Sequence, residues 1–158
     1  MSRLRLSDWA NIAEVVGGVA VVISLIYVGV QIRANTEEIR ASNRQQLISR
    51  AGNATSNAAS SPELAAALSK ASVGESLSPV ELSQYQYFVR GMEYDVQEAF
   101  LLFDEGGLDE AYWLTRASIF RAYMANATAK EVYRRDRDLG VLHPSFVAWA
   151  NAELEANN

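Results

Sequence analysis

The sequence predicts an all-α fold, in which one N-terminal transmembrane helix continues into a long juxtamembrane helix and is followed by a small helical bundle. A single apolar stretch predicts the first part, and Pro and Gly residues at positions typical of helix starts and ends predict the rest. No stretch alternates with the period of two that a half-buried strand requires. We therefore divide the 158 residues into a short N-terminal tail at 1–8, a transmembrane helix at 9–33, a juxtamembrane helix at 34–60 and a bundle at 61–158.

The apolar stretch extends from Trp9 to Arg33. Between Ala10 and Ile32 it contains 12 Ile, Leu or Val residues and one acidic residue, Glu14. A helix over this stretch is roughly 35 Å long at about 1.5 Å per residue, which is enough to cross a hydrocarbon core of about 30 Å. The stretch is therefore predicted to span a membrane and to contact lipid.

A cleaved signal peptide is the alternative interpretation of this stretch. Arg3 and Arg5 resemble the charged start of a signal peptide, but the apolar segment is longer than the usual 7–15 residues or so. No cleavage site of the small-residue type follows Val30.

More basic residues follow the stretch than precede it, which favours a cytoplasmic C-terminal domain. The four that follow are Arg33, Arg40, Arg44 and Arg50.

Small and polar residues recur at heptad spacing along one face of the predicted span. This small-residue row consists of Ala13, Gly17, Ala20, Ser24, Tyr27 and Gln31. Pairs of small residues four apart let helix backbones approach closely in lipid, so we expect a homo-oligomer. A parallel, β-branched row consists of Ile12, Val16, Val19, Ile23, Ile26 and Val30. One row is expected to form the interface and the other to face lipid.

Glu14 is the one charged residue between Ala10 and Ile32 of the predicted span. In an oligomer it would form a ring of carboxylates near one mouth, an arrangement that attracts cations in some pores. The alternative is that Glu14 lies at headgroup depth, about a turn and a half after Trp9, where water solvates it. Both interpretations remain open at this point.

Three short motifs in this part of the chain suggest a resemblance. They are Trp9-x-x-Ile-Ala-Glu14, Ser24-Leu-Ile-Tyr27 and Gln31-Ile-Arg-x-Asn-Thr36. The first 40 residues or so resemble the opening of a widespread group of uncharacterised bacterial membrane proteins that have one N-terminal span and a small helical domain. The resemblance implies a bacterial inner (cytoplasmic) membrane location and brings no activity with it.

The remainder of the chain predicts helices separated by short turns. The span continues without Pro to about Ser60, although residues 51–61 have few large apolar side chains and are expected to fray or bend. Five further helices are expected, and their start signals are Ser60-Ser-Pro-Glu63, Ser78-Pro-Val-Glu81, Leu108, Thr128-x-x-Glu131 and Pro144. They would form a bundle with short connections.

The residues offer little for catalysis or for metal binding. There is no Cys, and His143 is the only His, so neither a Cys-ligated metal nor a Glu-x-x-His metal centre is available. We interpret His143, two residues before Ser145, as a cap or surface residue rather than the base of a nucleophile pair. We therefore predict no catalytic residue, no cofactor and no metal site. The net charge of −5 argues against a nucleic-acid partner, because such a partner requires a basic surface.

Two clusters of side chains have ordinary structural explanations. One is acidic and is expected to be solvated; it contains Glu93, Asp95, Glu98, Asp104, Glu105, Asp109 and Glu110. The other is aromatic and at helical spacing belongs more often to a core than to a binding surface. It contains Tyr85, Tyr87, Phe88, Tyr94, Tyr112 and Trp113.

The sequence thus favours a non-enzymatic, single-span membrane protein that self-associates through its first helix and acts as a scaffold or interaction module. Membrane lipid, further copies of the chain and an unidentified protein are the expected partners. The alternative is a small homo-oligomeric channel, in which the small-residue row lines the conduit and Glu14 lies at its mouth.

Overall fold

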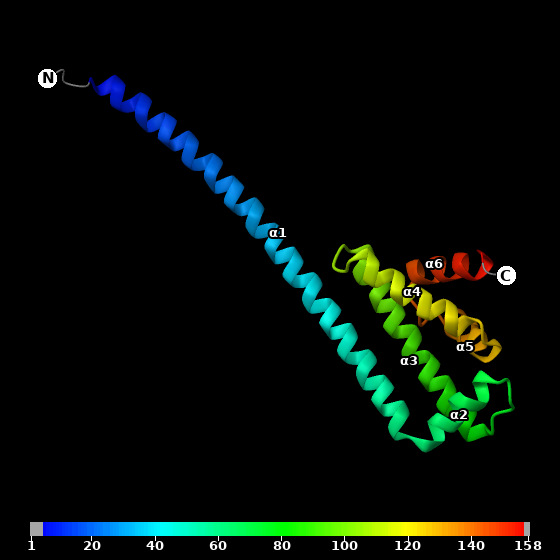
Figure 1. Ribbon diagram of the computed structural model, residues 1–158. Coiled ribbons are helices and arrows are strands. Elements are labelled where there is room, and N and C mark those ends of the chain that lie inside the picture. Colours follow the sequence, from blue (N-terminus) through cyan, green and yellow to red (C-terminus); the bar gives the residue numbers. More distant parts are fainter. Residues whose placement is uncertain (1–4, 157–158) are drawn as a thin grey trace. The chain divides into compact units, whose positions relative to one another are not determined.

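The computed structural model describes residues 5–156, which form six helices joined by short connections (Figure 1). The helices are α1 (Leu6–Ser60), α2 (Pro62–Ser72), α3 (Pro79–Asp104), α4 (Glu110–Met124), α5 (Ala127–Asp138) and α6 (Pro144–Ala156). The described residues contain no strand, and the all-α prediction is confirmed. Part of the predicted tail, Arg3 included, lies outside the described residues.

The chain divides into two compact units, Met1–Ile39 and Arg40–Asn158. The first unit contains the apolar beginning of α1. The second contains the end of α1 together with the five shorter helices, so the residues from Arg40 to Ser60 pack as part of the bundle. The fraying or bending expected over residues 51–61 is confined to Ser61, since α1 is helical as far as Ser60 and α2 begins at Pro62.

Helix α3 lies at the centre of the bundle and packs against α2, α4, α5 and α6. Its start is fixed by a capping box, in which the Ser78 hydroxyl accepts a hydrogen bond from the Glu81 amide and the Glu81 carboxylate accepts one from the Ser78 amide. Its end is followed by Gly106, whose φ of +75° suits a residue without a Cβ.

An aromatic cluster forms one part of the bundle core. The rings of Trp113 and Trp149 meet edge to face with their centroids 4.8 Å apart, and the ring of Phe100 contacts both. Phe120 and Phe146 complete the cluster and are almost fully buried. Each ring removes a large apolar area from water, so this cluster links α3, α4 and α6 into one body.

The end of α1 is joined to the turn between α3 and α4. Asn43 Nδ2 donates a hydrogen bond of 2.8 Å to the carbonyl oxygen of Gly107, and Arg44 pairs with Asp109 at 2.6 Å. Leu47, one turn further along α1, is 1% exposed. These contacts order the turn and attach residues of α1 to the bundle.

Two of the predicted helix caps are displaced, and α4 begins at Glu110 rather than at Leu108. Ser61, not Ser60, caps α2 by accepting a hydrogen bond from the Leu64 amide. Asn126, not Thr128, caps α5, because the Asn side-chain oxygen reaches two successive amides from one residue before the helix. Ser61 follows the predicted cap of α2 by one position, and Asn126 precedes the predicted cap of α5 by two. Both predicted helices are therefore present, with small shifts at their starts.

Candidate functional site

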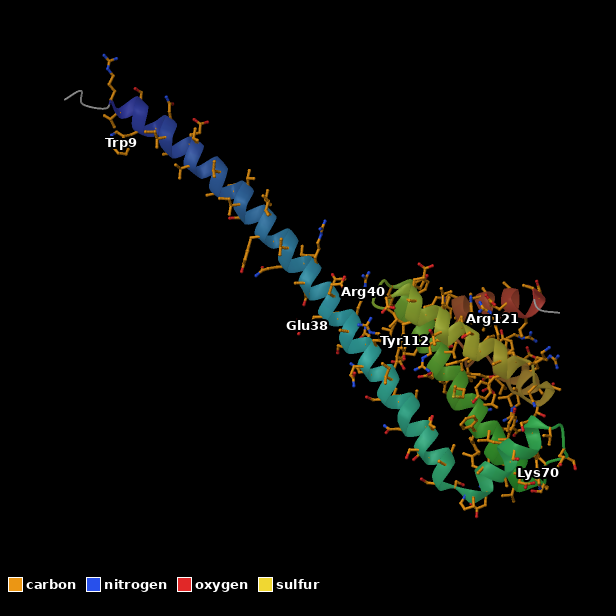
Figure 2. The ribbon with its side chains drawn as sticks, viewed as in Figure 1. Trp9, Glu38, Arg40, Lys70, Tyr112 and Arg121 are labelled. Atoms are coloured by element: carbon orange, nitrogen blue, oxygen red, sulfur yellow. The ribbon has the colours of Figure 1, made fainter. Side chains whose placement is uncertain are left out.

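The first candidate site is the exposed apolar surface of α1 in the first unit. Its large aliphatic side chains from Ile12 to Ile32 are between 47% and 68% exposed, and no residue of its most apolar window is buried. By length and composition this helix could cross a membrane. Trp9, near the beginning of α1, is also exposed (Figure 2), and its ring suits a membrane–water interface.

All six residues of the small-residue row are exposed on this helix: Ala13, Gly17, Ala20, Ser24, Tyr27 and Gln31. The Ser24 hydroxyl donates a hydrogen bond of 2.8 Å to the carbonyl oxygen of Ala20. Gln31 Nε2 donates one of 2.9 Å to the Tyr27 hydroxyl. The polar groups of the row therefore find partners within their own helix, and Glu14, beside Ala13, is exposed as well.

The second candidate site is a groove of about 670 Å³ in the second unit, hereafter the apolar groove. The end of α1 forms one wall, α3 forms the other, and Ser61 and Leu64 contribute from the start of α2. Its apolar lining consists of Ala51, Ala54, Leu64, Tyr87, Phe88, Gly91, Met92 and Tyr94. A pocket of this size with a mainly apolar lining is typical of sites for small molecules.

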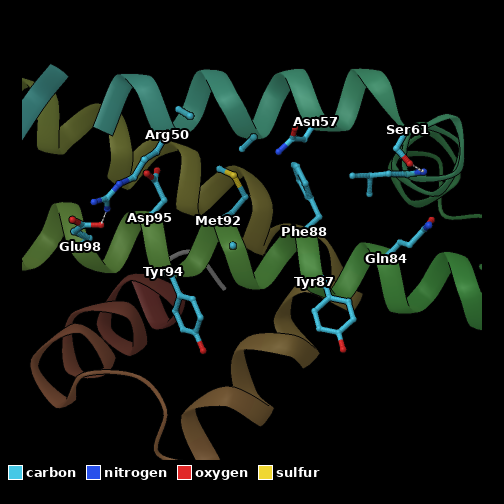
Figure 3. Close-up of a pocket in the computed structure, with 14 residues that line it drawn as sticks. Arg50, Asn57, Ser61, Gln84, Tyr87, Phe88, Met92, Tyr94, Asp95 and Glu98 are labelled. Carbon is cyan, nitrogen blue, oxygen red and sulfur yellow. Dashed lines mark hydrogen bonds and ion pairs between the residues drawn. The ribbon is translucent and has the colours of Figure 1, made fainter. Parts of the chain in front are cut away.

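Polar side chains lie toward the two ends of the apolar groove, with Phe88 and Met92 between them (Figure 3). Ser61 and Gln84 lie toward one end, and Asn57 lies beside Phe88. Arg50, Asp95 and Glu98 lie toward the other, where Arg50 forms an ion pair with Glu98. The groove therefore has an apolar middle and two polar ends.

Several oxygens at these ends are buried without a hydrogen bond. They are Gln84 Oε1 and both carboxylate oxygens of Asp95. Asp95 Oδ2 does lie 3.1 Å from Arg116 Nη1, close enough for an ion pair although their orientation gives no hydrogen bond. Burial raises the pKa of the Asp95 carboxyl, and the positive charges of Arg116 and Arg50 act in the opposite direction.

A second group of buried charges joins α3 and α5 outside the groove. Arg90 donates to both carboxylate oxygens of Asp136, which is 1% exposed, and the contact through Nη2 measures 2.8 Å. Glu93, also 1% exposed, has no hydrogen bond to either carboxylate oxygen. Burial, together with the nearby charge of Asp136, raises the pKa of Glu93 to about 8. The expectation of solvated acids was wrong for Glu93 and Asp95, because both face the bundle interior.

His143 lies just before α6. Contrary to expectation, its Nδ1 lies 2.8 Å from the Ser145 hydroxyl oxygen, and Nδ1 also accepts a weaker hydrogen bond from the Ser145 amide. The main-chain amide of His143 donates to the Gln97 side chain. This is the geometry of a helix cap at an exposed position, as the sequence indicated for His143.

Within residues 5–156, no cluster of three or more His, Cys, Asp or Glu could hold a metal ion.

The apolar groove was not found from the sequence. Its aromatic wall belongs to the cluster that was interpreted as core, yet Tyr87 is 69% exposed and Tyr94 is 42% exposed. Its other wall is the alanine-rich end of α1, where fraying or bending was expected. The sequence signal for a groove was the pairing of an alanine-rich helix with a helix rich in aromatic residues. Small side chains opposite large ones leave unfilled space between two packed helices.

No protein-family model, curated protein or solved structure matches this chain in comparisons with known proteins.

Proposed function

We propose that the chain is a non-catalytic scaffold anchored in a bacterial inner membrane. Residues 9–33 span the bilayer, further copies associate through the small-residue row, and the bundle is presented on the cytoplasmic side as an interaction module. The observation that supports this best is the continuous exposure of aliphatic side chains around α1 from Ile12 to Ile32. A surface of this kind is unfavourable in water and is stable in lipid or against another helix.

The small-residue row supports the self-association step. Gly17 has open space beside it, so a neighbouring backbone can approach there. The Ser24 hydroxyl is already bonded to Ala20, so the row can enter a close helix contact without leaving a polar group unpaired.

The same hydrogen bonds favour an interface over a conduit. A pore lining needs polar groups that exchange partners with water or ions, whereas the Tyr27 hydroxyl and the Gln31 amide are bonded to each other. Glu14 is the residue that separates the two functions. In a channel, Glu14→Gln changes cation flux through proteoliposomes while assembly persists. In a scaffold, the wild type and this variant both leave flux at the level of empty liposomes.

The test of anchoring uses the full chain in bacterial membranes. The expected result is that it stays in the membrane fraction at alkaline pH, which releases peripheral proteins. A chain recovered in the soluble fraction at full length, or after loss of its N-terminal helix, would contradict the anchor.

Self-association is tested by energy transfer between labelled copies in liposomes at low protein-to-lipid ratio. Gly17→Leu and Ser24→Leu are expected to weaken the transfer, because the larger side chain separates the backbones. Val19→Leu, on the β-branched row, is the matched control and should leave the transfer unchanged. The assignment of the interface fails if only the control loses transfer, and self-association itself fails if the wild type shows none.

A further inference from the structure

We propose that a pocket between α5 and α6 binds the phosphate monoester group of a small hydroxylated molecule. This α5–α6 pocket has a volume of about 290 Å³. Its polar lining consists of Lys130, Tyr133, Arg134 and Arg137 on α5 and of Asn151 and Glu155 on α6. The proposal goes beyond the scaffold function and does not depend on membrane insertion, because all of these residues belong to the unit Arg40–Asn158.

Positive charge is concentrated in the α5–α6 pocket, although the whole chain has a net charge of −5. Lys130, Arg134 and Arg137 follow one another at intervals of four and three residues, so they share one face of α5. Among the described residues that line the pocket, Glu155 is the one carboxylate, which leaves two positive charges in excess. A phosphate monoester carries nearly two negative charges at neutral pH and matches this excess.

Both arginines keep N–H groups for such a ligand. Arg134 pairs with Glu131 through Nη1 at 3.2 Å, and Arg137 pairs with Asp138 through Nε at 2.8 Å. The two carboxylate side chains are 72% and 66% exposed and do not line the pocket, and exposed pairs of this kind contribute little to stability. A guanidinium has five N–H donors in a planar fork that matches phosphate oxygens, so a bound phosphate can use the donors that these pairs leave.

The floor of the α5–α6 pocket adds a neutral donor. The hydroxyl of Tyr133, which is 0% exposed, donates a hydrogen bond of 2.9 Å to Asn151 Oδ1. Nδ2 of the same amide is accessible and has no hydrogen-bond partner among the described residues, so it can donate to a phosphate oxygen. Glu155, one helical turn after Asn151, can accept a hydrogen bond from a ligand hydroxyl. The lining therefore suits a phosphate and a hydroxyl on one small molecule.

The test uses the full chain in nanodiscs of phosphatidylcholine, which has no net charge, and the soluble probe glycerol 3-phosphate. Titration calorimetry is expected to show a saturable component of one site per chain that empty nanodiscs lack. Glycerol, which has no phosphate, should give no such component.

A second arm presents the same phosphate monoester as a lipid headgroup. The chain is placed in nanodiscs that also contain phosphatidic acid, and native mass spectrometry counts the phosphatidic acid molecules retained per chain. Binding of glycerol 3-phosphate identifies a soluble ester as a source, and retained phosphatidic acid that Arg134→Gln removes identifies the headgroup. A wild type that binds neither probe overturns the proposal.

Three arginine variants locate the site on α5. Arg134→Gln and Arg137→Gln each remove a lining charge and should weaken binding about tenfold or more, as expected for the loss of a hydrogen bond to a charged group. Arg135→Gln is the matched control, because Arg135 is exposed on the same helix and does not line the pocket. It should change the affinity less than about threefold, since solvent and salt screen its charge. Equal losses in all three variants would show only a general attraction to α5 and would overturn the pocket.

Asn151→Asp tests the donor on α6. The variant keeps an acceptor for the Tyr133 hydroxyl but replaces Nδ2 by a carboxylate oxygen, so the saturable component should disappear. Asn53→Asp adds the same charge on an exposed part of α1 outside the pocket and should bind like the wild type. Wild-type affinity in Asn151→Asp would overturn the assignment. Arg134 is exposed, so Arg134→Gln decides the question if Asn151→Asp fails to fold.

Discussion

Arg116 Nη2 donates a hydrogen bond of 3.1 Å to the main-chain carbonyl oxygen of Leu47, and both residues are buried. The contact joins α4 to α1 across 69 positions of sequence. Leu47 lies inside α1, so its carbonyl oxygen accepts this hydrogen bond in addition to the one along the helix. Nη1 of the same guanidinium lies 3.1 Å from Asp95 Oδ2 on α3. One side chain thus links three helices behind the apolar groove.

Replacing Arg116 by Met should lower the free energy of unfolding by about 3–5 kcal/mol, because the buried carboxylate of Asp95 loses its ion-pair partner. Arg121→Met is the matched control. Its partner is Glu153, both side chains are more exposed than those of the first pair, and the expected cost is below about 1 kcal/mol. Denaturant unfolding of both variants measures the difference. Equal costs would contradict a structural role for Arg116.

Glu93→Gln should change how stability depends on pH. The folded-state pKa of about 8 lies above the unfolded value of 4.5, so Glu93 stabilises the fold while it is protonated. That contribution is complete below about pH 4.5 and is lost as the pH rises through 8, when a carboxylate forms beside Asp136, with Arg90 as the nearby cation. Tyr133, whose pKa is raised to about 12 mainly by burial, stays neutral over this range.

The expected readout is the difference in unfolding free energy between Glu93→Gln and the wild type. It should shift in favour of the variant by on the order of 4 kcal/mol between pH 5 and 8.5. Glu131→Gln, with a side chain 72% exposed, should follow the wild-type profile. A constant difference for Glu93→Gln across this range would contradict the burial of an ionising group.

Two glycines should respond to alanine in opposite directions. Gly106 has a φ of +75°, where a Cβ is strained, so Gly106→Ala should destabilise the fold by about 1–2 kcal/mol. Gly91 is within α3 with open space around it, so Gly91→Ala should stabilise the fold by roughly 0.5–1 kcal/mol. Thermal unfolding of the two variants checks the signs. A gain at Gly106 would show that the turn does not need this conformation.

Phe146→Ala should cost about 3–5 kcal/mol, because its ring is 0% exposed and contacts Phe100, Phe120 and Trp149. The emission of Trp149 should shift to longer wavelength as water enters the cavity. Leu139→Ala removes a side chain that is 64% exposed and should change stability by less than about 0.5 kcal/mol. A small cost at Phe146 would place the aromatic cluster outside the cooperative core.

Local signals predicted the helices well, because helix starts and ends depend on residues close in sequence. Ser78-Pro-Val-Glu81 forms the predicted capping box, and α3 ends at Asp104 as expected. The displaced caps at Ser61 and Asn126 show the limit of such signals, since neighbouring Ser, Asn and Thr residues can each serve as the cap. The small-residue row could be placed on one face of α1 for the same reason, because helical spacing alone determines which residues share a face.

The sequence by itself determined that this chain is all-α and that its first helix is apolar enough to cross a membrane, since both follow from composition and period along one element. Only the tertiary structure decided which acids are buried and where the groove lies. Glu93 and Asp95 are two residues apart on α3, yet one faces Asp136 of α5 and the other faces Arg116 of α4. Burial depends on which helix packs against each face, and that choice is made by the whole core rather than by any segment.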